Sequence, residues 1–373
     1  MKKLLFFSHG LSANGIETFL YNILGRLDST KYDITVVIAI DEGESQLHEQ
    51  EVLDAGIKVI HAGDLDGLWK KLAYIRNIKR IIKTGGYDIV HSNMDLLNGI
   101  TLHYAKRFKV PVRICHAHNS ESQYAPKGLK AAALMGVHKL YSRIMKKSLI
   151  SSSTVLLSCS ELAGKYFYSG HDFKIIYNGI DLEKFRMPQN FDRDGYSARL
   201  GMEATSKRIV SVGRLSMQKN PLFAMEIAAA LKGIRDDFQY VWVGSGELQE
   251  ETVQRARELG VEDKMVFTGV RTDVPQLLNC CDCFLMPSLF EGLPFSLIEA
   301  QAAGLNCVVS DTVTTMADIG AVTYCPLSGS ARDWAQLVSE TLDRPKPTLD
   351  AEKAALFDVR NTVRQLEEIY DEA

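Results

Sequence analysis

Four charged side chains in the second half of the chain could together bind a diphosphate and the hydroxyl groups beside it. Arg214 and Lys219 lie in a loop between an apolar run and a helix-forming segment. Arginine offers a planar fork of donors and lysine a compact charge, so the pair could neutralise a diphosphate as it leaves. A helix would separate Glu291 from Glu299 by roughly 12 Å. Carboxylates bind hydroxyls strongly, although two glutamates on a solvent-facing helix and a basic surface loop are also ordinary arrangements.

A turn and a helix start follow Glu291 directly. Gly292 permits a tight turn, Leu293 follows it, and Pro294 suits the first turn of a helix. The backbone N–H groups at a helix N-terminus carry partial positive charge and bind anions. We therefore expect the segment from Gly292 onward to form an anion site beside the two glutamates.

Two further glycine-containing loops follow predicted strands in the same half. Gly213 precedes the first cation, and Gly244 and Gly246 form a GxG sequence after another apolar run. Glycine lets backbone approach a nucleotide closely, although a GxG sequence alone is weak support for such a site. Loops at the carboxyl ends of parallel strands meet at one edge of a sheet, so one ligand could contact all of these loops.

The first half of the chain offers one loop and a histidine pair. Asn14 and Gly15 follow the first apolar run and open a helix, so this loop could lean over the phosphates of a ligand. His116 and His118 end another predicted strand. Because histidine is a frequent active-site residue, we expect His118 to face the ligand and His116 to be structural.

Alternating strands and helices position these residues. Short apolar runs alternate with segments of helical period, which predicts parallel sheets covered by helices on both faces. Strands are expected at 3–7, 33–40, 57–60, 89–91, 112–115, 154–158, 208–212, 240–244, 265–268, 283–286 and 307–310. Helices are expected at 17–27, 68–83, 96–108, 129–149, 220–231, 248–259 and 294–303.

The alternation stops once and then restarts. Residues 183–206 are polar and contain Pro188, Gly195 and Gly201, which is typical of a connector. We predict an α/β protein of two doubly wound, Rossmann-like domains, 1–180 and 181–356, facing each other across a cleft. The C-terminal segment 357–373 has helical period in its later part and could pack back on the first domain.

Taken together, the motifs resemble those of a known family. They are Asn14-Gly15-Ile16-Glu17, His116-Ala117-His118-Asn119, Tyr177-Asn178-Gly179-Ile180-Asp181, Gly213-Arg214-Leu215, Gln218-Lys219-Asn220, and Glu291 with Glu299. The set resembles the family 4 (group 1) retaining glycosyltransferases of the GT-B fold, and most closely the bacterial members that build capsular or exopolysaccharide repeat units. The resemblance covers nearly the whole chain and rests on the joint occurrence of the motifs.

This resemblance implies a role for each matching residue of the donor site. Arg214 and Lys219 would bind the diphosphate of a nucleotide-sugar donor. Glu291 would contact the donor sugar and Glu299 the ribose. His118 would lie near the reacting carbon.

The resemblance also places the nucleotide base. It would rest near Arg271 and the backbone of Gly269 and Val270. The family usually has two glycines where Asn14 and Gly15 stand. Asparagine tolerates a left-handed backbone better than most residues, so we expect this loop to survive.

The resemblance implies transfer of a hexose-type sugar from a nucleotide sugar to a glycan or a polyprenyl-diphosphate-linked saccharide. The expected donor is a UDP-sugar. The first domain would bind the acceptor and the second the donor. The hypothesis is transfer with retention: the acceptor attacks the face from which the diphosphate departs, and the leaving phosphate takes the proton. No protein nucleophile is then required.

Three other functions are compatible with two Rossmann-like domains. A nucleotide-sugar epimerase or hydrolase would turn over the donor without an acceptor. A catalytically silent binding protein would bind the donor and transfer nothing, which the intact set of charged residues argues against. A dehydrogenase is disfavoured because no GxGxxG follows the first predicted strand.

No cofactor and no metal are expected. Two acidic triplets, Asp64-x-Asp66 and Asp192-x-Asp194, match the short pattern of metal-dependent transferases. Both fall in predicted loops away from the other motifs, and such triplets are common by chance. The two cations of the donor site would supply the charge that Mg²⁺ supplies elsewhere.

The cysteines indicate a reducing compartment. The chain has seven, an odd number, scattered through its length, which argues against a disulfide framework. Cys280, Cys281 and Cys283 cluster, but no second pair of cysteines or histidines has zinc-like spacing. We interpret these three as small buried thiols.

The charge distribution points to an anionic partner for the first half. Residues 67–147 carry sixteen Lys and Arg against three Asp and Glu, a net charge of +13, which leaves −16 on the rest. No stacking motif for nucleic acid accompanies these charges. An anionic membrane surface or a pyrophosphate-linked lipid fits better.

One basic segment fits either a membrane-facing helix or an ordinary surface helix. Its cations and apolar residues are Lys127, Lys130, Lys139, Arg143, Lys146 and Lys147 around Leu134, Leu140 and Ile144. No apolar run reaches the roughly 18–20 residues that span a membrane, and the apolar start of the chain is too short for a signal peptide. The expected location is the cytoplasm, peripheral to the inner face of the membrane.

Overall fold

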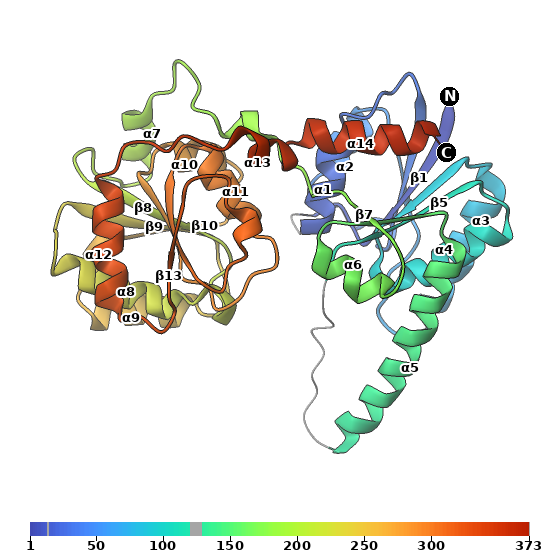
Figure 1. The fold of residues 1–373 in the computed structure, drawn as a ribbon, viewed down its shortest axis with the longest axis horizontal. Coiled ribbons are helices and arrows are strands. Elements are labelled where there is room, and N and C mark those ends of the chain that lie inside the picture. The colour runs from blue at the N-terminus through green and yellow to red at the C-terminus, as the bar shows by residue number, and fades with distance from the viewer. Residues whose placement is uncertain (13–14, 120–128, 373) are drawn as a thin grey trace. The chain divides into compact units, whose positions relative to one another are not determined.

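A computed structural model describes residues 1–12, 15–119 and 129–372. The structure divides into two compact units (Figure 1). Unit 1 holds Met1–Gly179 and the chain from Asp358 onward, and unit 2 holds Ile180–Phe357. The chain thus leaves unit 1 once and returns to it.

Unit 1 is built on a parallel sheet with the order β3-β2-β1-β4-β5-β6-β7 among the described residues. Its central strands are buried on both faces, which explains their near-continuous apolar sequences. Successive strands add outward in opposite directions from β1 and from β4, so this pair is the topological switch point, where such sheets bind ligands. The strands are β1 (Lys2–Ser8), β2 (Tyr32–Ile38), β3 (Lys58–His61), β4 (Ile89–Ser92), β5 (Val112–Ala117), β6 (Val155–Ser158) and β7 (Lys174–Ile175).

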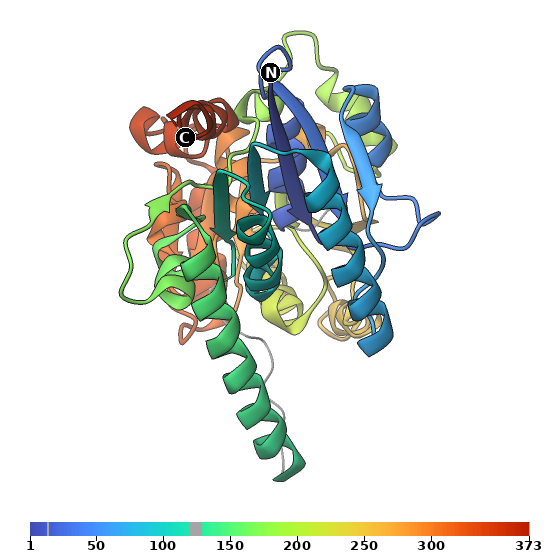
Figure 2. The same cartoon turned by 90° about the vertical axis from the view of Figure 1, so that its right-hand side faces the viewer.

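Helices cover both faces of this sheet. One core joins it to α1 (Gly15–Leu24), the short α2 (Glu49–Asp54) and α14 (Val359–Glu372). The other core joins it to α3 (Leu68–Gly85), α4 (Asn98–Arg107), α5 (Leu129–Ser152) and α6 (Glu161–Tyr168). The long α5 extends beyond the sheet that its C-terminal end covers (Figure 2).

The C-terminal helix α14 is an integral part of unit 1. Its side chains Leu366 and Tyr370 are fully buried in the core with β1 and β2. Lys2 Nζ donates to the Tyr370 backbone oxygen at 2.7 Å, and the Tyr32 hydroxyl donates to Asp371 at 2.7 Å. The two ends of the chain are therefore held together in one core.

Unit 2 repeats the design with the order β10-β9-β8-β11-β12-β13, again parallel within the described residues. Its switch point lies between β8 and β11. The strands are β8 (Lys207–Val212), β9 (Phe238–Val243), β10 (Met265–Gly269), β11 (Cys283–Met286), β12 (Asn306–Ser310) and β13 (Val322–Cys325).

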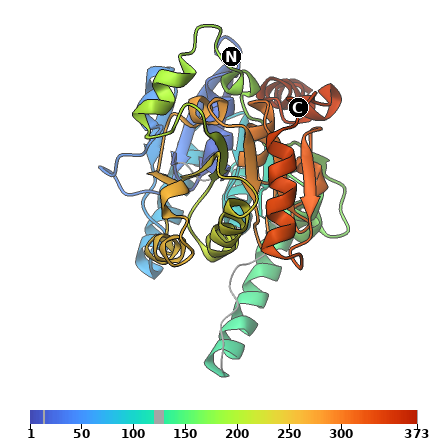
Figure 3. The same cartoon turned by 90° about the vertical axis from the view of Figure 1, so that its left-hand side faces the viewer.

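The helices of unit 2 also lie on both sides of its sheet. One core holds side chains of α8 (Pro221–Lys232), α9 (Gln249–Glu258) and α12 (Ala331–Leu342). In Figure 3, which faces unit 2, α12 is the long orange-red helix. The remaining helices are α7 (Arg193–Arg199), α10 (Val274–Asn279), α11 (Phe295–Ala302) and α13 (Ala351–Leu356).

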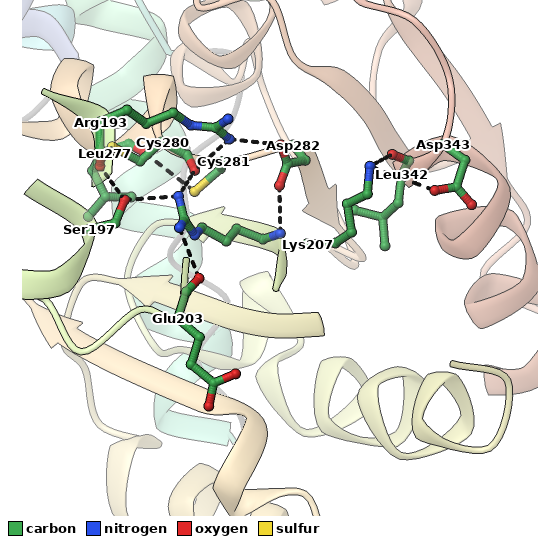
Figure 4. Close-up of polar contacts among 11 residues, drawn as sticks. Arg193, Ser197, Glu203, Lys207, Leu277, Cys280, Cys281, Asp282, Leu342 and Asp343 are labelled. Carbon is green, nitrogen blue, oxygen red and sulfur yellow. Dashed lines mark hydrogen bonds and ion pairs between the residues drawn. The ribbon is translucent and has the colours of Figure 1, made fainter. Parts of the chain in front are cut away.

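The polar segment 183–206 contains the helix α7, which the sequence did not predict. Arg193 donates to Asp282 at 2.8 Å (Figure 4). The buried Arg208 of β8 donates to Ser197 of α7 at 2.9 Å. Polar residues of this segment thus form hydrogen bonds with the rest of unit 2, to which the segment belongs.

Candidate functional site

Two loops meet at the switch point of unit 2. The loop after β8 carries Lys219, whose Nζ lies 2.7 Å from Oε1 of Glu291 in the loop after β11. Gln218 donates to the other Glu291 oxygen at 3.2 Å, and the Leu289 backbone N–H donates to the Gln218 carbonyl at 2.8 Å. The structure therefore brings together two of the charged residues that the sequence singled out, 72 positions apart.

The charged residues of this site differ in exposure. The Lys219 and Glu291 side chains are 17% and 6% exposed, so their attraction is weakly screened by water. Arg214 is exposed, and its side chain makes no hydrogen bond or ion pair with the described residues. Its guanidinium remains available for an anionic ligand.

Glycines allow the loops of this site to pack backbone against backbone. Gly213 and Gly244 have φ angles of 152° and 134°, which other residues rarely adopt. A Cβ on Gly244 would lie 2.2 Å from the Gly213 carbonyl oxygen, and one on Gly246 would lie 2.3 Å from that of Leu215. These glycines are required by the loop packing itself, whether or not a ligand also approaches them.

We expect Gly246→Ala to lower the free energy of unfolding of unit 2 by about 1–3 kcal/mol, because its Cβ would overlap backbone that cannot rotate away. Urea unfolding followed by the fluorescence of the buried Trp242 and Trp334 measures this. Gly292→Ala is the matched control, since a Cβ there meets nothing within 4 Å. Equal stability of the two variants would contradict the prediction.

The helix α11 begins beside this loop pair. It starts at Phe295, with Pro294 as its N-cap and no side chain capping its first turn. Gly292 is exposed and Leu293 half-buried in the turn that precedes it. The uncapped N–H groups of α11 are therefore available to an anion.

Glu299 lies further along α11. It is half-buried, and its carboxyl group has no hydrogen-bond or ion-pair partner among the described residues. Burial raises the pKa of Glu299 to about 7. A carboxyl group held in this state is suited to a ligand hydroxyl, which would supply the missing hydrogen bond.

If Glu299 binds donor as a carboxylate, donor affinity rises with pH. With a pKa of about 7, the ionised fraction and hence the affinity increase roughly tenfold from pH 6 to pH 8. Calorimetric titration with a UDP-sugar checks this, because its diphosphate diester does not titrate in that range. Glu299→Gln should flatten the profile; a profile that Glu299→Gln leaves unchanged would rule the assignment out.

Of the residues predicted near the nucleotide base, Arg271 already has a partner in unit 2, whereas Val270 is exposed. Arg271 makes two hydrogen bonds to Asp273, at 2.7 and 2.6 Å, and Tyr196 donates to the same carboxylate at 2.8 Å. Val270 is 79% exposed, and Gly269 accepts a backbone hydrogen bond from the GxG loop. The backbone at 269–270 is open to a ligand. To bind a ligand, the Arg271 guanidinium would have to break one or both of its hydrogen bonds to Asp273.

His118 lies at the carboxyl end of β5 in unit 1 and is half-buried. Its Nε2–H donates to the Asn93 side-chain oxygen at 2.9 Å, so Nδ1 carries the lone pair. Burial lowers the pKa of His118 to about 3, which keeps the ring neutral. Of the loop after β1, Gly15 opens α1, and Asn14 lies outside the described residues.

A buried chain of rings runs from α14 to His118. The Tyr370 hydroxyl lies 2.6 Å from His91 Nδ1, and His91 Nε2 lies 3.2 Å from His116 Nδ1. The rings of His116 and His118 are 4.2 Å apart between centroids. His116 is fully buried. His91, Asn93 and Tyr370 belong to no sequence motif, so their place in this chain of rings could not be predicted from the sequence.

The acidic triplets have other partners. Asp64 pairs with Lys70 at 2.9 Å, and Asp192 caps α7 by accepting from the Gly195 backbone at 2.9 Å.

The three clustered cysteines are buried free thiols. Within the described residues, no group of three or more His, Cys, Asp or Glu side chains is arranged to hold a metal. Independence of metal remains a prediction.

The basic helix α5 is partly apolar on its surface. Val137, Leu140 and Ile144 are 68%, 59% and 52% exposed and lie among Lys139 and Arg143. Lys146 instead donates to a backbone oxygen of α6 at 2.6 Å, and Lys127 lies outside the described residues. None of the described helices combines the length and the apolar character needed to cross a bilayer.

Comparison with known proteins identifies both units. The family model described as Glycosyltransferase Family 4 matches residues 13–184, and the model described as Glycosyl transferases group 1 matches residues 192–353. The chain belongs to the family 4, group 1 glycosyltransferases. The first match lies almost wholly in unit 1 and the second lies in unit 2, so this glycosyltransferase carries the family pattern along most of its length.

Individual relatives agree with this assignment. A protein designated glycosyltransferase EpsF from Bacillus subtilis (strain 168) is 29% identical over 99% of this chain and 96% of its own. An Escherichia coli protein named UDP-Gal:alpha-D-GlcNAc-diphosphoundecaprenol alpha-1,3-galactosyltransferase is 29% identical over 65% of this chain and 63% of its own. The solved structure of Anabaena HepE in complex with UDP has a TM-score of 0.79, with 19% identity and full coverage of both chains. The predicted GT-B fold is confirmed.

Proposed function

We propose that this glycosyltransferase moves a hexose-type sugar from a UDP-sugar to a glycan or a polyprenyl-diphosphate-linked saccharide in bacterial surface polysaccharide synthesis. The observation that carries the proposal is the Lys219–Glu291 pair at the unit 2 switch point, beside the unpaired Arg214 and the uncapped α11. Such a cluster fits a diphosphate bearing a sugar. The names of the E. coli relative and of the Anabaena complex support the choice of a uridine nucleotide.

In this proposal the charged residues of unit 2 divide the binding of the donor among them. Arg214 and the N-terminus of α11 bind the diphosphate, and Lys219, oriented by Glu291, stabilises the charge that develops on it. Glu291 also contacts the donor sugar, and Glu299 binds the ribose. Unit 1 binds the acceptor, with His118 near the reacting carbon.

The proposed reaction retains the configuration of the transferred sugar. The acceptor oxygen bonds to the anomeric carbon on the face from which the diphosphate departs. The electron pair of the broken bond passes to the diphosphate, and a leaving phosphate oxygen takes the acceptor proton. No metal is required in this scheme, because the two cations and the helix N-terminus neutralise the leaving group.

A lipid-linked acceptor would place the enzyme at the cytoplasmic face of a membrane. The exposed apolar and basic side chains of α5 are suited to an anionic bilayer surface. Sedimentation with phosphatidylglycerol vesicles tests this part separately. Failure to bind at low as well as high salt would end the membrane assignment and leave the transferase assignment intact.

The decisive experiment is a thermal-shift panel of nucleotide sugars with and without EDTA, followed by a transfer assay with the best donor. A selective upward shift that EDTA leaves unchanged, with sugar transfer to acceptor, supports the proposal. Donor turnover that the acceptor does not accelerate would indicate the epimerase or hydrolase alternative. Donor binding with no turnover at all would indicate a silent binding protein.

A further inference from the structure

Asp95 lies three residues after β4, in a backbone conformation that few residues other than glycine adopt. Its φ angle is 49°, in the left-handed region. One carboxylate oxygen accepts a hydrogen bond from Asn119 at 2.6 Å. The other, Oδ1, is shielded from solvent and meets no hydrogen-bond partner of good geometry in the described part of the chain.

The surroundings enforce this arrangement. The buried Asn98 accepts from the Met94 backbone N–H at 2.8 Å and donates toward the His116 carbonyl at 3.4 Å, which fixes the turn to the end of β5. Burial raises the pKa of Asp95. Hydrogen bonds from Asn119 and the His118 backbone, and the charge of His9, act in the opposite direction. Backbone strain of this kind is found mainly at functional sites. Asp95 as a whole is only half-buried, and its Oδ2 has a second lone pair that a ligand hydroxyl can use.

The position of Asp95 in the sheet gives the same indication. Asp95 follows β4 and His9 follows β1, and these two strands form the switch point of unit 1. The corresponding place in unit 2 is where Lys219 and Glu291 meet. Doubly wound sheets bind their ligands at such points, and a carboxylate there suits a hydroxyl-rich ligand.

We propose that Asp95 accepts a hydrogen bond from a hydroxyl group of the acceptor sugar and so orients that sugar for transfer. The inference rests on the proposed function, and it adds a residue that selects the acceptor. Asp95 takes no proton in the reaction, which still passes to the leaving phosphate. Its role concerns the acceptor alone, so reaction of the donor with water should not depend on it.

The test compares Asp95→Asn and Asp95→Gly with the wild-type chain. Both replacements tolerate a left-handed backbone, so both should fold. Lys109→Gly is the matched control, because Lys109 is exposed in unit 1 and has a φ angle of 61°. The probes are the UDP-sugar with the largest thermal shift and a panel of undecaprenyl-diphosphate-linked saccharides that includes N-acetylglucosamine, each in detergent.

We expect kcat/KM for the acceptor to fall about 10- to 100-fold in both Asp95 variants, as for a lost hydrogen bond to a charged group. Hydrolysis of the UDP-sugar without acceptor should stay within twofold of wild type, as should all activities of Lys109→Gly. Three outcomes would overturn the role of Asp95 and leave the proposed function standing. They are transfer within twofold of wild type in both variants, a fall in hydrolysis equal to the fall in transfer, and unfolding of both variants. A wild-type chain that transfers to no acceptor would overturn the proposed function as well.

Discussion

Replacing Lys219 by methionine should lower the rate of sugar transfer roughly 10²- to 10³-fold, the loss typical of removing one group that stabilises transition-state charge. Its Nζ lies 2.7 Å from Glu291 and the Lys219 side chain is only 17% exposed, so water cannot readily replace the lost charge. Methionine keeps the length of the side chain and its apolar stem. The measurement is steady-state transfer, with kcat and KM for the donor separated.

Glu291→Gln tests the other side of the same ion pair. Glutamine retains the shape but loses the charge that orients Lys219, so we expect a fall of similar order in kcat. Lys232→Met is the matched control, since Lys232 also makes an ion pair in unit 2, at 2.9 Å from Asp263 on the surface. If Lys219→Met keeps more than a third of wild-type kcat, the proposed charge neutralisation is wrong.

Unit 1 should lose stability in mild acid, between pH 6.5 and 4.5. Burial lowers the pKa of His91 to about 3 and that of His116 well below its usual value. The folded unit therefore binds no proton at these sites, whereas the unfolded chain binds two as pH falls below about 6.5. The free energy of unfolding should drop by about 1.4 kcal/mol per pH unit for each histidine, hence by about 2.8 kcal/mol per pH unit for His91 and His116 together.

Hydrogen exchange read by mass spectrometry can follow this loss for each unit separately. Peptides from β1, β4 and β5 should lose protection as pH falls, after correction for intrinsic exchange, and those of unit 2 much less. His91→Gln should reduce the slope, and His103→Gln, at an exposed site in the same unit, is its control. A slope that is identical in wild type and His91→Gln would exclude these histidines as the cause.

Much of the architecture could be predicted from local sequence. Strands such as β1 and β9 are buried on both faces, so their apolar runs mark them clearly. The two-residue β7 and the short α2 offer too few residues for a period to emerge. The helix α12 lies outside the predicted helices, although Ser330 and Asp333 form a capping box at its start that the sequence itself contains.

Site residues that lie in a loop motif could be predicted from the sequence. Site residues that meet only because of the order of the strands could not. The loops holding Lys219 and Glu291 contain recognisable turn and cation patterns, and both follow strands at the switch point. The contact between His91 and His116 exists because β4 and β5 are neighbours, which no local pattern reveals. Tyr370 reaches His91 across 279 positions of sequence, and only the folded chain shows it.

The return of α14 to unit 1 has a consequence for synthesis of the protein on the ribosome. The apolar face that Leu366 and Tyr370 cover belongs to the residues made first, yet all of Ile180–Phe357 must be translated before the helix emerges. At about 5–20 residues per second, that interval lasts on the order of ten to thirty seconds. During it the nascent first half presents an uncovered apolar face, a natural substrate for chaperones. Premature termination anywhere in the second half should therefore release a defective first half as well.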